Sequence, residues 1–214
     1  MPGFALDKNT IVFYTKRMSH RENSKEIILD RAVQMASVQG LNGLTIGRLA
    51  EALSLSKGGV CAHFPSKIKL QVAAVERATQ IFRRVVTMSA LEKAPGLPQL
   101  QALSDAWFEY LVAGTFEGGC FFTNALLEVD DLESNEVREA VRLQYNRFIE
   151  LVERCARDAV ARSHFRSDLE IHQFAFEFLG IQFSTLAWRG LGRDADMIAV
   201  AKRAMADLFQ RSAS

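Results

Sequence analysis

An all-α chain in two parts is the fold class that this sequence predicts, from three observations. Only four prolines occur in 214 residues, and no long run alternates polar and apolar residues as strands do. Most segments instead repeat apolar residues at the spacing of one helix face. Short helices separated by tight turns fill the first third of the chain, and longer amphipathic helices follow. We therefore expect an N-terminal three-helix head and a larger C-terminal helical domain.

Composition limits the compartment and the type of partner. No apolar run reaches the roughly 18–20 residues of a membrane helix, and the N-terminus lacks the apolar region of a signal peptide. Three cysteines without metal-like spacing indicate free thiols in a reducing compartment. We expect a cytoplasmic protein with no membrane partner.

Charge is divided unevenly along the chain. Up to Arg84 there are 13 Lys and Arg against 6 Asp and Glu, and from Val85 onward there are 13 against 19. A basic front half favours a polyanionic partner, whereas the acidic rear half argues against nucleic-acid binding there.

The first segment of the chain, residues 1–22, shows no helical period and is expected to form a flexible arm. Two alternatives stay open: that translation starts at Met18, or that basic residues of this segment contact phosphates. The strongly amphipathic stretch 24–39 predicts the first helix, and Gly40 is a natural C-terminal cap.

The segment 45–67, TIGRLAEALSLSKGGVCAHFPSK, has the dimensions of a helix-turn-helix. Thr45 and Ser56 each precede an apolar helical period and can cap free backbone N–H groups. Ser54 and Leu55 form the turn, and Pro65 ends the second helix because it lacks an N–H. The second helix of such a unit lies in the DNA major groove.

Residues of this unit are therefore the candidates for contact with DNA. Gly58 and Gly59 weaken the helix by about 1–2 kcal/mol, which indicates that the backbone approaches DNA closely. Lys57, Lys67 and Lys69 stand near helix N-termini, where the dipole disfavours cations unless an acidic partner is present, and a duplex supplies one. The predicted DNA-binding residues are Thr45, Arg48, Ser56, Lys57, Gly58, Gly59, Cys61, Ala62, His63 and Lys67.

Six further helices are expected after the head. Their predicted ranges are 66–90, 97–116, 120–127, 135–163, 169–188 and 195–210. Abundant aromatic residues with few buried charges favour a cavity for a small, largely apolar or aromatic effector. Its predicted lining is Trp107, Tyr110, Leu111, Phe122, Asn124, Leu126, Tyr145 and Phe148, with Gln144 as a further polar group.

The last two predicted helices carry apolar stripes that would form a four-helix bundle with a second copy. The predicted dimer interface consists of Phe174, Phe178, Ile181, Trp188, Ile198 and Met205.

The stretch SKEIILDRAVQMASVQGLNGLTIGRLAEALSLSKGGVCAHFPSK resembles the DNA-binding head of TetR-family (tetracycline-repressor-like) transcriptional regulators, with a match from Ser24 to about Val75. GGCFFTNALLEVDD resembles a region of their ligand domains. The resemblance implies a homodimer whose variable C-terminal domain, here 69–214, binds a small effector and whose head, 23–68, releases operator DNA. Cys61 departs from the family pattern, which usually has tyrosine there.

Other function classes find less support in the sequence. No nucleophile and base cluster together, so we expect no enzyme, no catalytic residue and no cofactor. His164 and His172 flank two carboxylates, but a solvated helix cap is favoured over a metal site. An activator, or a regulator that responds to oxidation of Cys120, remains an alternative to a repressor.

Overall fold

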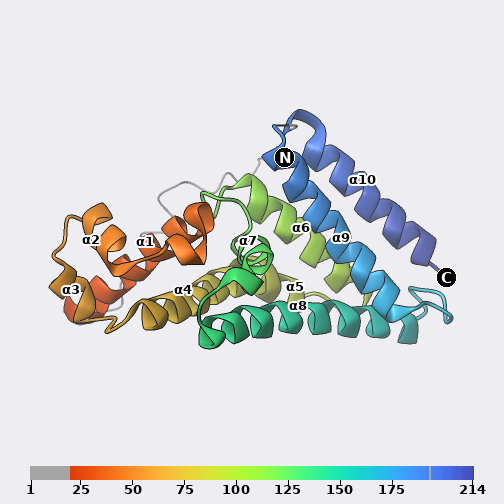
Figure 1. Ribbon diagram of the computed structural model, residues 1–214. Coiled ribbons are helices and arrows are strands. Elements are labelled where there is room, and N and C mark those ends of the chain that lie inside the picture. The colour runs from red at the N-terminus through yellow and green to blue at the C-terminus, as the bar shows by residue number, and fades with distance from the viewer. Residues whose placement is uncertain (1–19, 193) are drawn as a thin grey trace.

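The computed structural model describes residues 20–192 and 194–214, which form an elongated helical molecule (Figure 1). Three helices that follow one another in the sequence form the head at one end: α1 (His20–Gly43), α2 (Ile46–Ala52) and α3 (Lys57–Cys61). Among the described residues the only β feature is an isolated bridge between Phe165 and Ala213. The predicted all-α class is confirmed.

A bundle of longer helices forms the rest of the molecule. α4 leads from the head into this bundle, α8 lies along it, and α9 and α10 pack against each other at the far end (Figure 1). The elements are α4 (Lys67–Phe82), a π-helical segment (Arg83–Thr87), α5 (Met88–Leu91), α6 (Leu97–Val112), α7 (Phe121–Leu127), a 3-10 turn (Val129–Asp131), α8 (Asn135–Ala161), α9 (Ile171–Gly190) and α10 (Asp194–Ser212). None of the described helices is both long and apolar enough to cross a membrane.

The two predicted hydroxyl caps, Thr45 and Ser56, are confirmed. The hydroxyl of Thr45 accepts a hydrogen bond from the N–H of Arg48 at 3.3 Å, and that of Ser56 accepts from Gly59 at 3.1 Å. Ser66 caps α4 in the same way. Each hydroxyl satisfies an N–H that has no partner inside its own helix, which fixes where the helix begins.

Gly40 interrupts α1 rather than ending it. Its φ of 75° and ψ of 164° are not helical, and the chain resumes a helical turn up to Gly43. A Cβ at Gly40 would lie 2.6 Å from Oε2 of Glu128. That carboxylate accepts hydrogen bonds from the N–H groups of Leu41 at 2.6 Å and Asn42 at 3.4 Å. Glycine is therefore needed both for the positive φ and for the close approach of Glu128.

This contact belongs to a polar interface between α1 and residues 115–131, which we call the α1–α7 junction. Asn124 donates to the carbonyl of Ser37 at 3.1 Å, and the N–H of Gly118 donates to the Ser37 hydroxyl at 3.1 Å. Gln34 donates to the carbonyl of Thr115 and accepts from the N–H of Glu117, both at 2.9 Å. The junction attaches the head to α7 through groups that are mostly shielded from water.

Candidate DNA-binding surface and effector cavity

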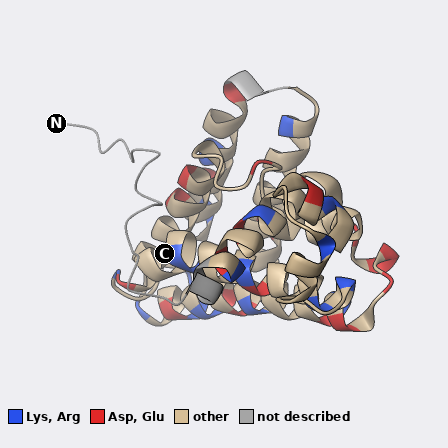
Figure 2. Cartoon of the chain, turned by 90° about the vertical axis from the view of Figure 1, so that its left-hand side faces the viewer, with Lys and Arg blue, Asp and Glu red and all other residues tan. Residues whose placement is uncertain are grey.

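The helix-turn-helix leaves one face of α3 open. Val60 and Phe64 are buried and hold α3 against the head. The positive φ of Ser54 (54°) reverses the chain between α2 and α3. Figure 2 views this end of the molecule, where basic and acidic positions both occur along the helices. The exposed residues are Ser56, Lys57, Gly58, Gly59, Cys61 and Ala62, and His63 is half-buried.

The two glycines of α3 have room for a side chain within the protein. A Cβ at Gly58 would meet only the Ser56 hydroxyl at 3.8 Å, and one at Gly59 would meet the same atom at 3.4 Å. Nothing within the described residues therefore requires glycine at these positions. The close approach of DNA to this backbone stays a prediction of the sequence.

Three of the other candidate DNA contacts already have partners in the protein. Thr45 caps α2, and Arg48 donates to the carbonyl of Gly43 at 3.3 Å. Lys67 forms a 3.4 Å ion pair with Glu133. Next to it, Lys69 and Glu136 form one of 2.7 Å.

These ion pairs revise the sequence-based argument about the lysines. The acidic partner that the helix dipole calls for comes from the loop before α8 and from α8 itself, not necessarily from DNA. A phosphate at Lys67 has to displace Glu133. Lys57 has no such carboxylate among the described residues, and its Cε lies 3.3 Å from the position of a Cβ on Gly47.

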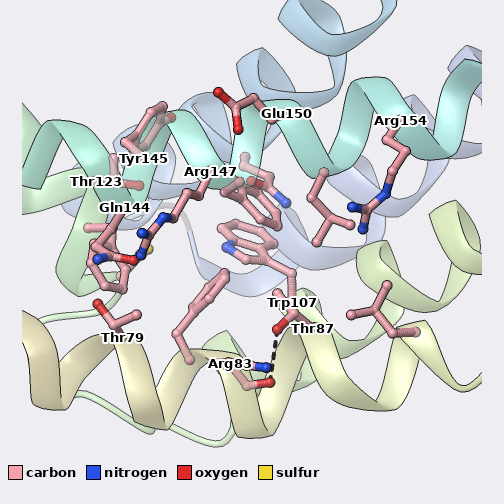
Figure 3. Close-up of a pocket in the computed structure, with 17 residues that line it drawn as sticks. Thr79, Arg83, Thr87, Trp107, Thr123, Gln144, Tyr145, Arg147, Glu150 and Arg154 are labelled. Carbon is pink, nitrogen blue, oxygen red and sulfur yellow. Dashed lines mark hydrogen bonds between the residues drawn. The ribbon is translucent and has the colours of Figure 1, made fainter.

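A cavity of about 570 Å³ opens among α4, the π-helical segment, α6, α7 and α8 (Figure 3). Its volume lies within the range of ligand pockets. The inner wall is aromatic, from Phe82, Trp107, Phe122 and Phe148. The π-helical segment contributes Arg83 and Thr87, and such segments often occur at functional sites.

A second groove, of about 500 Å³, lies between α9 and α10. Small residues line its floor, including Gly180, Ser184, Ala201 and Ala204. Trp188, on the same groove, is 38% exposed. Two such helices can approach a second copy closely because small residues let the helix backbones come together.

Comparison with known proteins gives the family. A model described as "Tetracyclin repressor-like, C-terminal domain" matches residues 96–205, half of the chain, and a model of "Bacterial regulatory proteins, tetR family" matches residues 28–74. The chain belongs to the TetR family. It is therefore a DNA-binding transcriptional regulator with a helix-turn-helix and a ligand-binding C-terminal domain, and not an enzyme. A search of curated protein sequences gave no match.

Solved structures of this family share the fold. A TetR regulator from Chloroflexus aurantiacus is 23% identical, with a TM-score of 0.77 over 90% of this chain and 96% of that one. One from Cytophaga hutchinsonii is 20% identical, with a TM-score of 0.78 over 92% and 98%. AibR in complex with isovaleryl coenzyme A and operator DNA is 17% identical, with a TM-score of 0.68 over 87% and 98%.

Half of the predicted effector residues lie on the cavity wall of this TetR-family regulator. Trp107, Phe122, Tyr145 and Phe148 line it, and so does Gln144. The structure places the other four elsewhere, because their helix faces turn toward other segments. Tyr110 and Leu111 are buried in the core of α6, Leu126 lies outside the wall, and Asn124 holds Ser37 in the α1–α7 junction.

Sequence reasoning missed the charged part of the cavity, although a signal for it exists. On α8 most of the lining residues follow one helical stripe, at offsets of three, four, seven and ten residues from Gln144: Arg147, Phe148, Leu151 and Arg154. When the stripe is traced through apolar residues alone, the two arginines are interpreted as solvent-exposed surface residues. Gln182 from α9, which is 4% exposed, was also missed.

Burial affects the pKa of one phenol on the cavity wall, that of Tyr145. Loss of solvent raises the pKa of Tyr145 well above its ordinary value, with a smaller contribution from Cys120. Its hydroxyl therefore stays protonated and available as a hydrogen-bond donor. Cys120 is buried and lines the cavity. Burial also raises the pKa of Cys155 to about 11, and its thiol contacts Oε1 of Gln99 at 3.4 Å.

The predicted dimer residues separate into two groups. Phe174, Phe178 and Met205 are at most 2% exposed inside one protomer, where Phe165 and Phe209 pack against the two phenylalanines. Their assignment to a dimer surface is corrected, because a fully packed side chain has no area left for a partner. Ile181 and Trp188 line the α9–α10 groove, and Ile198 is half-buried.

The histidines of the rear half are not part of a metal cluster. Nδ1 of His164 accepts a hydrogen bond from the N–H of Leu97 at 3.3 Å, and His172 lies 2.8 Å from Glu153. Among the described residues no group of three or more His, Cys, Asp or Glu is arranged to hold a metal ion.

Proposed function

We propose that this TetR-family regulator is a repressor that binds a palindromic operator as a homodimer and is released when a small effector fills the cavity. The observation that carries the proposal is the course of α4. This helix begins directly after α3, and its Thr79 and Phe82 line the cavity. An effector that shifts α4 therefore shifts the DNA-reading helix.

The α1–α7 junction supplies a second connection. α7 presents Phe122 and Thr123 to the cavity, and its Asn124 donates to α1. A ligand that moves α7 therefore pulls on α1 through hydrogen bonds. We propose that residues 23–68 act as the DNA-binding unit and residues 69–214 as the effector and dimer unit, coupled at these two places.

The proposed dimer uses the α9–α10 groove, with Ile181, Trp188 and Ile198 toward the second copy. Two heads in such a dimer read successive half-sites about 34–36 Å apart. Because operator DNA of a bacterium lies in the cytoplasm, we place the regulator there. AibR, which shares the fold, was solved with both isovaleryl coenzyme A and operator DNA, which supports an effector-linked DNA function.

Binding of the purified protein to the DNA upstream of its own gene tests the proposal. A complex of two protomers per operator is expected, with competition by the same sequence and not by a scrambled one. A promoter reporter then distinguishes the two directions of control: deletion of the gene raises expression for a repressor and lowers it for an activator. A complex that dissociates only with a thiol oxidant, and not in a Cys120→Ser variant, favours the redox alternative.

Lys57→Ala tests the orientation of α3 on DNA. Removal of one phosphate contact weakens binding to all sequences about equally and reduces the slope of log K against log salt by about one unit. Fluorescence anisotropy over a salt series measures this slope. Lys93→Ala, an exposed lysine far from the head, is the matched control. An unchanged slope for Lys57→Ala would contradict phosphate contact at this residue.

Gly58→Ala tests the close approach of the α3 backbone. Alanine fits the free protein and favours the helix, so the free energy of unfolding rises by up to about 1 kcal/mol. DNA affinity is expected to fall at the same time, because the added methyl group meets the duplex. Urea unfolding and anisotropy measure the two effects. Unchanged DNA affinity would remove the argument for close approach.

A further inference from the structure

The effector cavity is chemically asymmetric from its floor to its mouth. Toward the floor the lining is buried and largely apolar, with Trp107, Cys120 and Phe122 no more than 7% exposed. Toward the mouth it is charged, with Arg83, Arg147, Arg154 and Glu150, all exposed. In Figure 3 the side chains of Arg147 and Arg154 extend from α8 toward the lower helical segment, which carries Thr79, Arg83 and Thr87, whereas Glu150 does not.

Arg83, Arg147 and Arg154 form no ion pair with a carboxylate, whereas two other arginines of α8 do. On the same α8, Arg142 pairs with Glu139 and Asp130, and Arg157 pairs with Glu153. Among the residues that the structure describes, no ion pair or hydrogen bond engages the guanidinium groups of Arg83, Arg147 or Arg154. The one bond drawn at Arg83 in Figure 3 runs from the Thr87 hydroxyl to its backbone carbonyl, at 3.0 Å. With Glu150 counted, the mouth carries a surplus of positive charge that nothing in the described chain neutralises.

A buried donor without a partner lies deeper in the same cavity. Gln182 is only 4% exposed, and its Nε2 is inaccessible to solvent. This nitrogen forms no hydrogen bond within the described part of the chain. A buried amide N–H without a partner is destabilising. Gln182 lines the cavity, so rotation of its terminal amide would turn Nε2 toward the cavity, where an acceptor atom of a bound molecule would satisfy it.

We propose that the effector is an amphipathic organic anion. Its apolar body, of aromatic size, lies against Trp107 and Phe122. A carboxylate or phosphate at one end binds between Arg147 and Arg154 at the mouth. A hydrogen-bond acceptor at the other end meets Gln182. The assignment rests on the proposed function, in which this cavity is the effector site, and adds to it a charge and an orientation.

Calorimetric titration with three probes of one shape tests the charge. The probes are naphthaleneacetate, its neutral amide and the cationic naphthylethylamine. We expect the anion to bind about tenfold tighter than the amide, and the cation to bind most weakly, because only the anion gains charge-assisted hydrogen bonds. Equal or tighter binding of the amide or the amine would overturn the proposal. So would the failure of all three probes to bind.

Paired variants test the residues. Arg147→Gln combined with Arg154→Gln is expected to reduce the anion preference to about one. Arg142→Gln, on the same helix but outside the cavity, is expected to keep it. All three substituted arginines are exposed, and thermal unfolding checks that each variant is folded. A preference that survives loss of both arginines would overturn the assignment of the anion to the mouth.

Gln182→Leu tests the inner end. A hydroxylated naphthaleneacetate, with its hydroxyl opposite the carboxylate, is expected to bind several-fold tighter than the parent compound to the wild type. In Gln182→Leu this gain is expected to disappear. No gain in the wild type would overturn the role of Gln182.

DNA release is measured separately, on the protein–operator complex. If naphthaleneacetate binds with the expected charge preference but leaves the DNA complex intact, the anion site stands and the proposed effector function fails. If the complex releases DNA with the amide as readily as with the acid, the effector function stands and the anion assignment fails.

Discussion

Two chemically different sets of contacts lie near the boundary between the head and the rest of the molecule. Near α3, the ion pairs of Lys67 with Glu133 and of Lys69 with Glu136 bridge α4 to the start of α8, and their side chains are 33–80% exposed. At the α1–α7 junction, Ser37 and Glu128 form hydrogen bonds that are partly buried. Exposed ion pairs exchange partners at little cost, whereas shielded hydrogen bonds do not.

This difference assigns different tasks to the two contacts. The lysines next to α3 can leave a carboxylate for a phosphate with a small change in free energy. The hydrogen bonds of the junction link α1 to α7, and in the proposed mechanism this link couples the movements of the two helices. Substitutions in each contact are expected to affect stability to different degrees, most at the junction and least at the exposed ion pairs.

The largest effect is expected at Gly118. A Cβ there would lie 1.8 Å from the carbonyl oxygen of Ser37 and 2.3 Å from its carbon, so the backbone of α1 has to move. Gly118→Ala should lower the free energy of unfolding by about 3 kcal/mol. Urea unfolding measures this change. Gly190→Ala, whose Cβ meets nothing within 4 Å, is the control, and equal midpoints for both variants would contradict the tight junction.

An intermediate effect is expected from Glu128→Ala. The substitution leaves the N–H groups of Leu41 and Asn42 without their acceptor and should lower the free energy of unfolding by about 2 kcal/mol. Urea unfolding serves again, with Glu133→Ala as the control on the exposed side. If both carboxylates prove equally important for stability, the two contacts do not differ as described.

The smallest effect is expected at the pair of Lys69 and Glu136. Both side chains are about half exposed, so their coupling energy should be no more than about 0.5 kcal/mol and should vanish in high salt. A double-mutant cycle with Lys69→Gln and Glu136→Gln, at low and high salt, measures it. A coupling above about 1 kcal/mol that resists salt would show that this contact is as firm as the junction.

Features that depend on neighbours along the chain can be predicted from the sequence alone. Thr45, Ser56 and Ser66 cap their helices by hydrogen bonds to an N–H three residues later, and a pattern of this length is visible in the sequence. The helix-turn-helix and the all-α class follow from the same local periodicity. The aromatic residues Trp107 and Phe148 were also identified as cavity residues from composition and helix spacing.

Which helix faces pack against each other depends on the three-dimensional arrangement of the helices. Periodicity shows that Phe174 and Trp188 lie on apolar helix faces, but not that one packs inside the protomer and the other borders an open groove. Glu133 is 66 residues from Lys67, and no local rule pairs them. The arginines at the cavity mouth follow the same logic. Their spacing along α8 is visible in the sequence. That both line the cavity depends on how distant helices pack, and no short stretch of sequence encodes this packing.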